Sequence, residues 1–150
     1  RLIGEDFYWH FELWQHLRTV KMLNLNLYAY CHRQGSITTQ KKLLAPYIDY
    51  DKTFTCWKER CQHGCVNAEA ILAFLANMWI NRGYRYYRLS ASDKPKALEI
   101  LRKHADLLDD AATPKGKRVD KLLHLVGLRV TVYLLGWYWR LRSRIKGNAI

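Results

Sequence analysis

Apolar residues recur at helical spacing along the first part of the chain. Between Glu5 and Arg33 there is no Pro or Gly, and apolar side chains come three or four residues apart. Gly35 follows as a signal that ends a helix. The pattern predicts one long helix over residues 5–33, followed by a shorter helix over residues 37–44.

Two further helices are predicted in the middle of the chain. Residues 46–55 contain Pro, two Asp and two Thr, so they predict a loop. Asn67 has the side chain of an N-cap, and the apolar positions after it predict a helix over residues 68–89, which Gly83 kinks or ends early. A narrow apolar stripe predicts another helix over residues 94–110.

The last predicted helix, residues 119–145, carries the longest apolar run and follows a basic turn over residues 113–118. Arg118, Arg129 and Arg140 are eleven residues apart, close to three full turns, so they lie on one line. The other faces are apolar nearly all the way round, which is typical of a central bundle helix or an oligomer interface. A membrane span is the alternative, but Arg129 at its centre costs about 2.5 to 3.5 kcal/mol and both flanks are basic.

Together these elements predict an all-α protein. We expect one domain over residues 1–150, a helical bundle of four main helices with one or two short ones. A chain of 150 residues that is 49% hydrophobic can bury one core. With only 3 Pro and 8 Gly, it fits turn-dense all-β and collagen-like architectures poorly.

Basic residues are concentrated in the second half of the chain. Lys and Arg number 25 against 13 Asp and Glu, a net charge of +12. Residues 76–150 hold 16 of the basic and 6 of the acidic residues. Such a field favours a polyanion such as DNA, RNA or an anionic lipid surface, whereas solubility alone is the alternative explanation. We expect the partner to contact the basic second half and the C-terminal tail.

Charged and polar residues near the start of the chain argue against a secretory leader there. Glu5, Asp6, His10 and Glu12 interrupt the aromatic cluster near the start, so the pattern is not that of a secretory leader. We therefore expect an intracellular, cytoplasmic location. In that compartment the 4 cysteines are expected as free thiols or metal ligands before disulfides.

Tyrosine and arginine alternate in residues 82–88. Guanidinium groups pair with phosphates, and tyrosine rings offer faces on which unpaired bases stack, so the segment suits single strands or structured RNA. The alternative is that the tyrosines cover the core while the arginines reach to water. The predicted nucleic-acid-binding residues, which continue into the basic turn and the tail, are Arg82, Tyr84, Arg85, Tyr87, Arg88, Lys94, Lys96, Lys115, Lys117, Arg118, Arg140, Arg142, Arg144 and Lys146.

A second group of residues has metal-ligand chemistry. Zinc takes four N or S ligands in a tetrahedron. The candidate ligands are Cys56, Cys61, His63 and Cys65. Their spacings match no common zinc finger, so a structural zinc or iron–sulfur site competes with cysteines that pack as small hydrophobes.

Catalytic signatures are weak in this sequence. It has no Gly-rich phosphate loop, no Gly-x-Ser-x-Gly elbow and no His-Glu-x-x-His helix. Asp106, Asp109 and Asp110 are of the type that binds metal ions, but acidic residues at a helix end are more often a solvated face. We therefore predict no enzyme activity and no cofactor, with structural zinc as the exception.

These observations favour a non-catalytic nucleic-acid-binding protein, a small subunit of a larger nucleoprotein complex. Its arginines and lysines would contact phosphates and its tyrosines would stack on bases. Protein partners or self-association would use residues 119–141. Two alternatives stand beside this hypothesis: a membrane-associated or membrane-spanning protein that uses the final helix, and a metal-stabilised protein or enzyme that uses the Cys and His group.

Overall fold

The computed structural model describes residues 5–19, 21 and 44–145. The described residues form five α-helices and two short 3-10 helices, and no strand occurs among them. The elements are α1 (Glu5–His16), α2 (Ala45–Gln62), α3 (Ala68–Arg85), η1 (Tyr86–Arg88), α4 (Lys94–Lys103), η2 (Ala105–Leu108) and α5 (Pro114–Ile145). The prediction of an all-α fold is confirmed.

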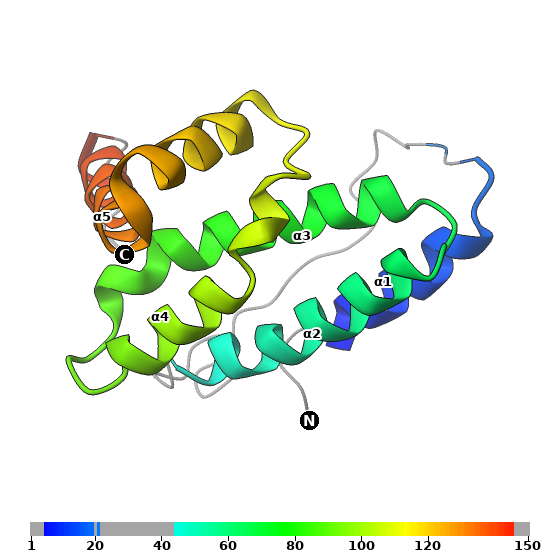
Figure 1. Ribbon diagram of the computed structural model, residues 1–150, viewed down its shortest axis with the longest axis horizontal. Helices are drawn as coiled ribbons and strands as arrows, with labels where there is room; N and C mark the ends of the chain where they lie inside the picture. Colours follow the sequence, from blue (N-terminus) through cyan, green and yellow to red (C-terminus); the bar gives the residue numbers. More distant parts are fainter. Residues whose placement is uncertain (1–4, 20, 22–43, 146–150) are drawn as a thin grey trace.

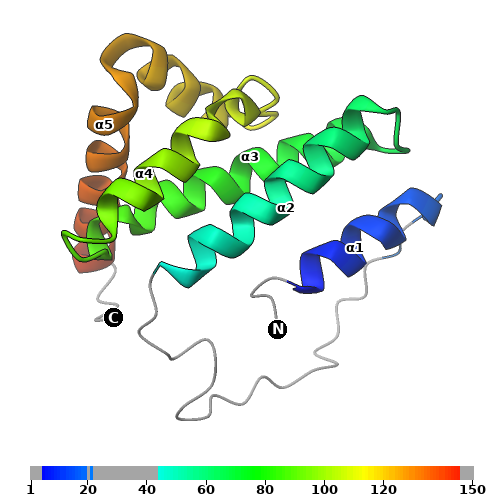
Figure 2. The same cartoon turned by 60° about the horizontal axis from the view of Figure 1, so that its bottom comes forward.

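Helix α3 is the centre of the fold. It contacts α2, α4, α5 and both 3-10 helices, and Figures 1 and 2 show α2 running beside it while α5 lies at its C-terminal end. Ile71, Leu75 and Trp79 are completely shielded from solvent and come four residues apart on one face. The indole Nε1 of Trp79 donates a hydrogen bond to the carbonyl oxygen of Leu101 at 2.9 Å. This bond joins α3 to α4 inside the core.

The loop predicted over residues 46–55 is wrong, because these residues belong to α2. Pro46 lies in the first turn, where a helix does not need its missing N–H. Buried aromatic side chains follow at intervals of three, four and three residues, which places them on one helix face. They are Tyr47, Tyr50, Phe54 and Trp57. The burial of these aromatic side chains stabilises the helix more than the Asp and Thr residues between them disfavour it.

Helix α1 ends at His16, and residues 17–19 are not helical, so the helix predicted over residues 5–33 is too long. The side-chain amide of Asn67 donates to the carbonyl oxygen of Trp14 at 2.6 Å. It satisfies one of the carbonyls that the end of a helix leaves without a partner. Asn67 does precede α3 as predicted, but with a φ of 60° and no side-chain cap of α3.

Some predictions fall on residues outside the described part of the chain. Residues 20 and 22–33 of the first predicted helix lie there. The helix predicted over residues 37–44 lies there too, apart from Leu44, which directly precedes α2. Lys146, the last predicted binding residue, is also outside the described residues.

The helices predicted over residues 68–89 and 94–110 are present but shorter. Each α-helix gives way to a 3-10 helix, after Arg85 in α3 and just beyond Lys103 in α4. Helix α3 is not kinked at Gly83, but it ends early, two residues later, and Tyr86–Arg88 form a separate 3-10 turn. Gly83 is buried, and a Cβ at this position would lie 2.8 Å from Cδ1 of Leu135. Glycine therefore lets α5 pack closely on α3.

Helix α5 begins earlier than predicted. Residues 113–118 are not a separate basic turn, since the helix starts at Pro114. The hydroxyl of Thr113 accepts a hydrogen bond from the backbone N–H of Gly116 at 3.0 Å. A threonine that accepts from the first turn is a standard N-cap.

Helix α5 is also broken, at Gly127. This residue has φ 76° and ψ 166°, a conformation that side chains with a Cβ rarely adopt. The two segments of α5 meet at an angle in Figures 1 and 2. Arg129 and Arg140 follow the break and keep their common line, whereas Arg118 precedes it and no longer shares that line.

Replacing Gly127 with alanine is expected to lower the free energy of unfolding by about 1 to 3 kcal/mol. No heavy atom of the described residues lies within 4 Å of an added Cβ, so the cost arises from the backbone conformation alone. Urea denaturation followed by circular dichroism measures the change. An unaltered free energy of unfolding would show that Gly127 does not hold this conformation in solution.

His104 links the end of α4 to α2. Its Nε2 lies 2.7 Å from Oδ1 of Asp51, and its ring packs against Phe54 with centroids 5.1 Å apart. The side chain is only 2% exposed. Burial lowers the pKa of His104 and outweighs the opposing effect of Asp51. The ring is therefore neutral at pH 7, and its Nε2–H donates to the carboxylate.

This histidine predicts a loss of stability in acid. In the unfolded chain its pKa is near 6.5, and folding lowers it. Between these two values the unfolded chain binds more protons, so the free energy of unfolding decreases as the pH falls below about 6.5. Urea midpoints at several pH values measure this slope, which should be shallower in His104→Gln. Equal slopes in the variant and the original protein would contradict this role of His104.

Candidate nucleic-acid interface

Two of the predicted binding residues lie in the core. Arg82 is buried, and its guanidinium carbon is 4.6 Å from the ring centroid of Tyr50. Burial lowers the pKa of Arg82. The hydroxyl of Tyr47 donates to the Arg82 carbonyl at 2.7 Å, and Tyr84 is likewise buried. Arg82 and Tyr84 are therefore removed from the candidate surface, because α3 turns them towards its neighbours.

The other members of the Tyr and Arg segment lie at the surface and meet α5. Arg85 and Arg88 are exposed. Tyr87 is partly buried, and the guanidinium carbon of Arg140 lies 5.3 Å from its ring centroid. The contact between Tyr87 and Arg140 places η1 next to the second segment of α5.

The two ends of α5 come together over Tyr84. The Nζ of Lys115, in the first turn of α5, lies 4.5 Å from the Tyr84 ring centroid. Burial and the nearby Arg142, close to the other end of α5, lower the pKa of Lys115. Burial raises the pKa of Tyr84, against the opposing charge of Arg142. The break at Gly127 lets residues so far apart on one helix approach each other.

The remaining predicted residues have different surroundings. Lys96 forms a salt bridge with Glu99 at 3.0 Å. The Nζ of Lys94 lies 5.9 Å from the ring centroid of Tyr133. Exposed positions on α5 are held by Lys117, Arg118 and Arg144. Lys117 and Arg118 lie on the first segment of α5, whereas Arg144 lies on the second, with Arg140 and Arg142.

Sequence reasoning missed the most exposed aromatic residues of α5. Tyr133, Trp137 and Tyr138 are 54%, 62% and 47% exposed. Tyr133 and Trp137 are one helical turn apart and share a face. The sequence signal was their spacing of four residues, but a helix that is apolar nearly all round does not reveal which face is covered.

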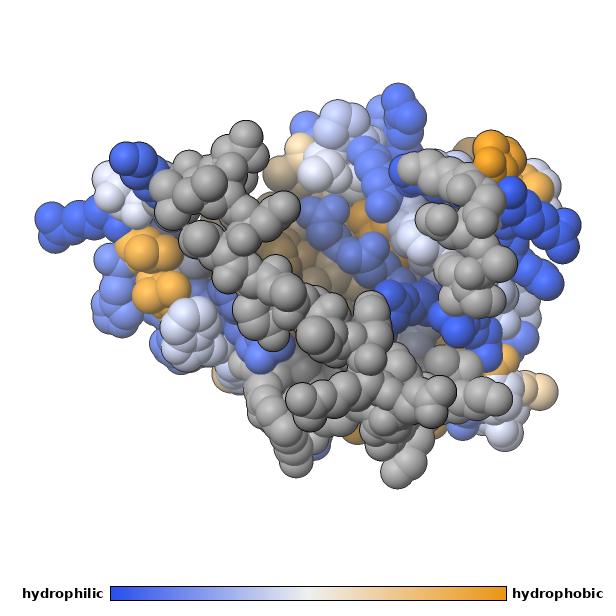
Figure 3. All heavy atoms as spheres, turned by 180° about the vertical axis from the view of Figure 1, so that it is seen from behind, coloured by the Kyte–Doolittle hydropathy of each residue, from blue (hydrophilic) through white to orange (hydrophobic). Residues whose placement is uncertain are grey.

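Arginines border these aromatic residues. Arg129 and Arg140 lie on one edge of the exposed stripe, and Arg142 lies on the other. We call the surface of α5 formed by Arg129, Tyr133, Trp137, Tyr138, Arg140 and Arg142 the aromatic–arginine face. From behind, hydrophilic side chains project beside a small apolar group on the right-hand edge of the molecule, the side on which α5 lies (Figure 3).

Helix α5 is long and apolar enough to cross a membrane by length and composition. In its most apolar stretch 22% of the residues are buried in the fold. The break at Gly127 interrupts this helix, and the hydroxyl of Thr131 donates a hydrogen bond to the Gly127 carbonyl oxygen at 2.9 Å.

The predicted cysteine and histidine ligands do not form one cluster. The Sγ atoms of Cys61 and Cys65 are 3.3 Å apart. Cys56 lies five residues before Cys61 on α2, so it is on a different helix face, and His63 is exposed. In the described residues, no three of these four have ligand atoms within 4.8 Å of one another. Zinc held by all four would require them to move.

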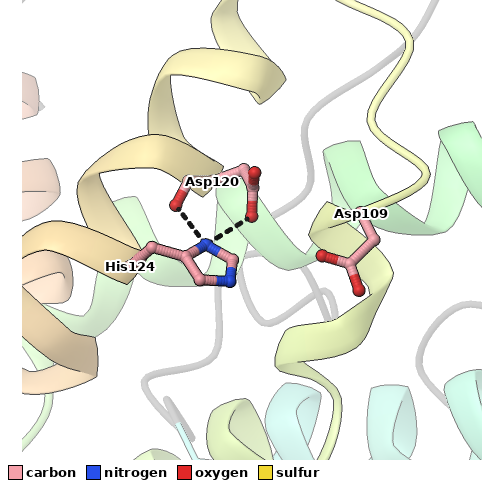
Figure 4. A group of neighbouring side chains, drawn as sticks. All are labelled: Asp109, Asp120 and His124. Atoms are coloured by element: carbon pink, nitrogen blue, oxygen red, sulfur yellow. Dashed lines mark hydrogen bonds and ion pairs between the residues drawn. The ribbon is translucent and has the colours of Figure 1, made fainter.

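A different group has metal-ligand chemistry: Asp109, Asp120 and His124, whose ligand atoms lie within 4.8 Å of one another. The Nδ1 of His124 is 3.0 Å from the Asp120 carbonyl oxygen and 3.1 Å from its Oδ1. Figure 4 shows Asp109 on the other side of the ring. One imidazole and two carboxylates suit a divalent cation such as Mn²⁺ or Zn²⁺. Asp109 and His124 are exposed, so water competes for any such ion.

Comparison with known proteins adds no functional assignment. No family model, no curated protein and no solved structure matches this chain. The aromatic–arginine face therefore carries the functional argument.

Proposed function

We propose that this protein binds single-stranded nucleic acid through the aromatic–arginine face and catalyses no reaction. The observation that carries this proposal is the combination, on one helix, of three exposed aromatic rings with arginines along both edges. Stacking on such rings is available to unpaired bases and is worth about 1 to 3 kcal/mol per base. Guanidinium groups bind the phosphates between those bases.

The charges on this face are available to a ligand. Arg129, Arg140 and Arg142 form no salt bridge with any described residue. Most of the net charge of +12 also comes from the second half of the chain, which contains α5. A polyanion is therefore drawn towards the side of the molecule that carries the stacking residues.

The same helix also offers a surface to other proteins. Leu125, Val130 and Leu134 are 82%, 45% and 41% exposed, so this helix presents aliphatic side chains to solvent as well as aromatic ones. This supports the proposal that the protein works as a subunit of a nucleoprotein complex, with a protein partner or a second copy at residues 119–141. Association with an anionic membrane through the same helix is the rival explanation.

The proposal is tested by replacing Arg129, Arg140 and Arg142 together with alanine. Fluorescence anisotropy of labelled single-stranded RNA, single-stranded DNA and duplex DNA is measured across a salt series. The slope of log K against log salt is negative, and each lost phosphate contact makes it less negative by about 0.7 for a single strand. The slope of the triple variant should therefore be less negative by about 2. Affinity should fall at every salt concentration, and the unaltered protein should prefer single strands.

A matched control removes the same charge elsewhere. Lys21, Lys52 and Arg102 are exposed residues outside α5. Their joint replacement with alanine should leave the salt slope nearly unchanged. Equal losses in the two triple variants would mean that net charge alone attracts the strand. If no strand binds at low salt but vesicles with anionic lipids do, the membrane explanation takes the place of the proposal.

A further inference from the structure

The end of α2 brings two thiols together. Gly64 has φ 87°, and its N–H donates to the carbonyl of Cys61 at 3.1 Å. The N–H of Cys65 donates to the carbonyl of Arg60 at 3.3 Å. These two bonds form a Schellman motif, which turns the chain back over the last helical turn. As a result the Sγ of Cys65 lies 3.3 Å from the Sγ of Cys61.

The third described cysteine is placed differently. Cys56 lies more than one turn earlier in α2 and interacts with the side chain of Tyr8 on α1. It therefore provides a comparison within the same protein: a cysteine on the same helix, without the Schellman turn that pairs Cys61 with Cys65.

The two paired thiols differ in access to solvent. Cys65 is partly exposed, whereas Cys61 is 8% exposed. Burial and the adjacent Cys65 raise the pKa of Cys61 to about 12. A reagent from solution therefore meets Cys65 first.

We propose that Cys61 and Cys65 are a thiol–disulfide exchange site that a small disulfide, such as oxidised glutathione, converts to an intramolecular disulfide. Cys65 loses its proton to solvent, and the thiolate attacks one sulfur of the small disulfide, whose S–S bond breaks; one glutathione thiolate leaves with the electron pair. Cys61 then loses its proton to solvent, and its sulfur attacks the Cys65 sulfur of the mixed disulfide. The second glutathione leaves as a thiolate. The two protein thiols are oxidised by two electrons, and the small disulfide is reduced to two thiols.

The burial of Cys61 sets the order and the rate of these steps. The mixed disulfide at Cys65 should form first and then convert to the intramolecular bond. Ring closure should become faster as the pH rises, because more of Cys61 is then ionised. The resulting bond would tie the last turn of α2 to the loop that leads to α3, close to the residues that hold α1.

The test uses the whole protein and oxidised glutathione as the oxidant. Samples taken over time are unfolded, alkylated and digested, and the peptide over residues 61–82, which contains both cysteines, is analysed by mass spectrometry. We expect this peptide to lose two hydrogens and to escape alkylation, while Cys56 is alkylated. Cys56→Ser should form the same bond, and Cys61→Ser should stop at a glutathione adduct on Cys65.

Three results would overturn the proposal. One is an adduct at Cys65 that persists in the unaltered protein without closing to a disulfide. Another is a disulfide that includes Cys56. The last is an unmodified peptide after exposure to oxidised glutathione. Since each of these is read from the unaltered protein, the test does not depend on how well any variant folds.

Discussion

Replacing Trp137 with alanine is expected to weaken binding of single-stranded RNA or DNA by about 5- to 150-fold at constant salt. The indole is 62% exposed, and Arg140 follows three residues later on the same side of the helix, so in the proposed complex a base would stack on Trp137 beside a phosphate bound by Arg140. Trp137→Phe keeps an aromatic face and should retain most of the affinity. Fluorescence anisotropy with one labelled strand at one salt concentration compares the three proteins.

Leu134→Ala is the matched control for this prediction. Leu134 is 41% exposed on the same segment of α5 and is aliphatic, so its loss removes apolar area without removing a stacking face. It should change the affinity little. If Leu134→Ala weakens binding as much as Trp137→Ala, the surface acts through general apolar contact, and a protein partner or a membrane fits it better than bases do.

Trp79→Ala is expected to lower the free energy of unfolding by about 3 to 5 kcal/mol. Trp79 is completely buried on the central helix α3. Its removal leaves a cavity and also deprives the carbonyl of Leu101 of the Nε1 hydrogen bond. Domains of this kind are stable by only about 5 to 15 kcal/mol, so the variant should be close to unfolding. Urea denaturation followed by circular dichroism measures the loss.

The two tryptophan variants serve as controls for each other. Trp137→Ala removes the same side chain from an exposed position, and exposed substitutions usually change stability by no more than about 0.5 kcal/mol. Trp137→Ala should therefore weaken binding with little loss of stability, whereas Trp79→Ala should lower the free energy of unfolding. Equal losses of stability in the two variants would contradict the burial of Trp79 and the exposure of Trp137.

Local sequence patterns predicted α3 and α4, where the apolar spacing and the residues before the helix both indicate a helix. The apolar spacing after Asn67 predicted α3, and a narrow stripe predicted α4. The pattern failed at α2, where Asp and Thr residues concealed the buried stripe that includes Tyr47 and Phe54. The composition of residues 46–55 predicted a loop. In the structure these residues are helical, and their buried aromatic side chains stabilise the helix by packing in the core.

The candidate site could be predicted only in part, because tertiary packing decides which face of a helix is covered. Of the three arginines predicted on one line, Arg129 and Arg140 share a helical segment, whereas the break at Gly127 separates Arg118 from them. Nothing in the local sequence showed that Arg82 would be buried against Tyr50, since that contact joins two helices. The break at Gly127 was equally hidden, because a glycine within an apolar run is compatible with a continuous helix.

The central claim, that the aromatic–arginine face binds single strands, is tested most directly by photo-cross-linking. A uridine-containing RNA strand is irradiated with the unaltered protein, the complex is digested with trypsin, and the cross-linked peptides are identified by mass spectrometry. Cleavage after Arg129 and Arg140 yields the peptide over residues 130–140, which contains Tyr133, Trp137 and Tyr138. We predict that the main cross-links lie in this peptide. Cross-links confined to other parts of the chain, or an RNA strand that does not cross-link at low salt, would contradict the account.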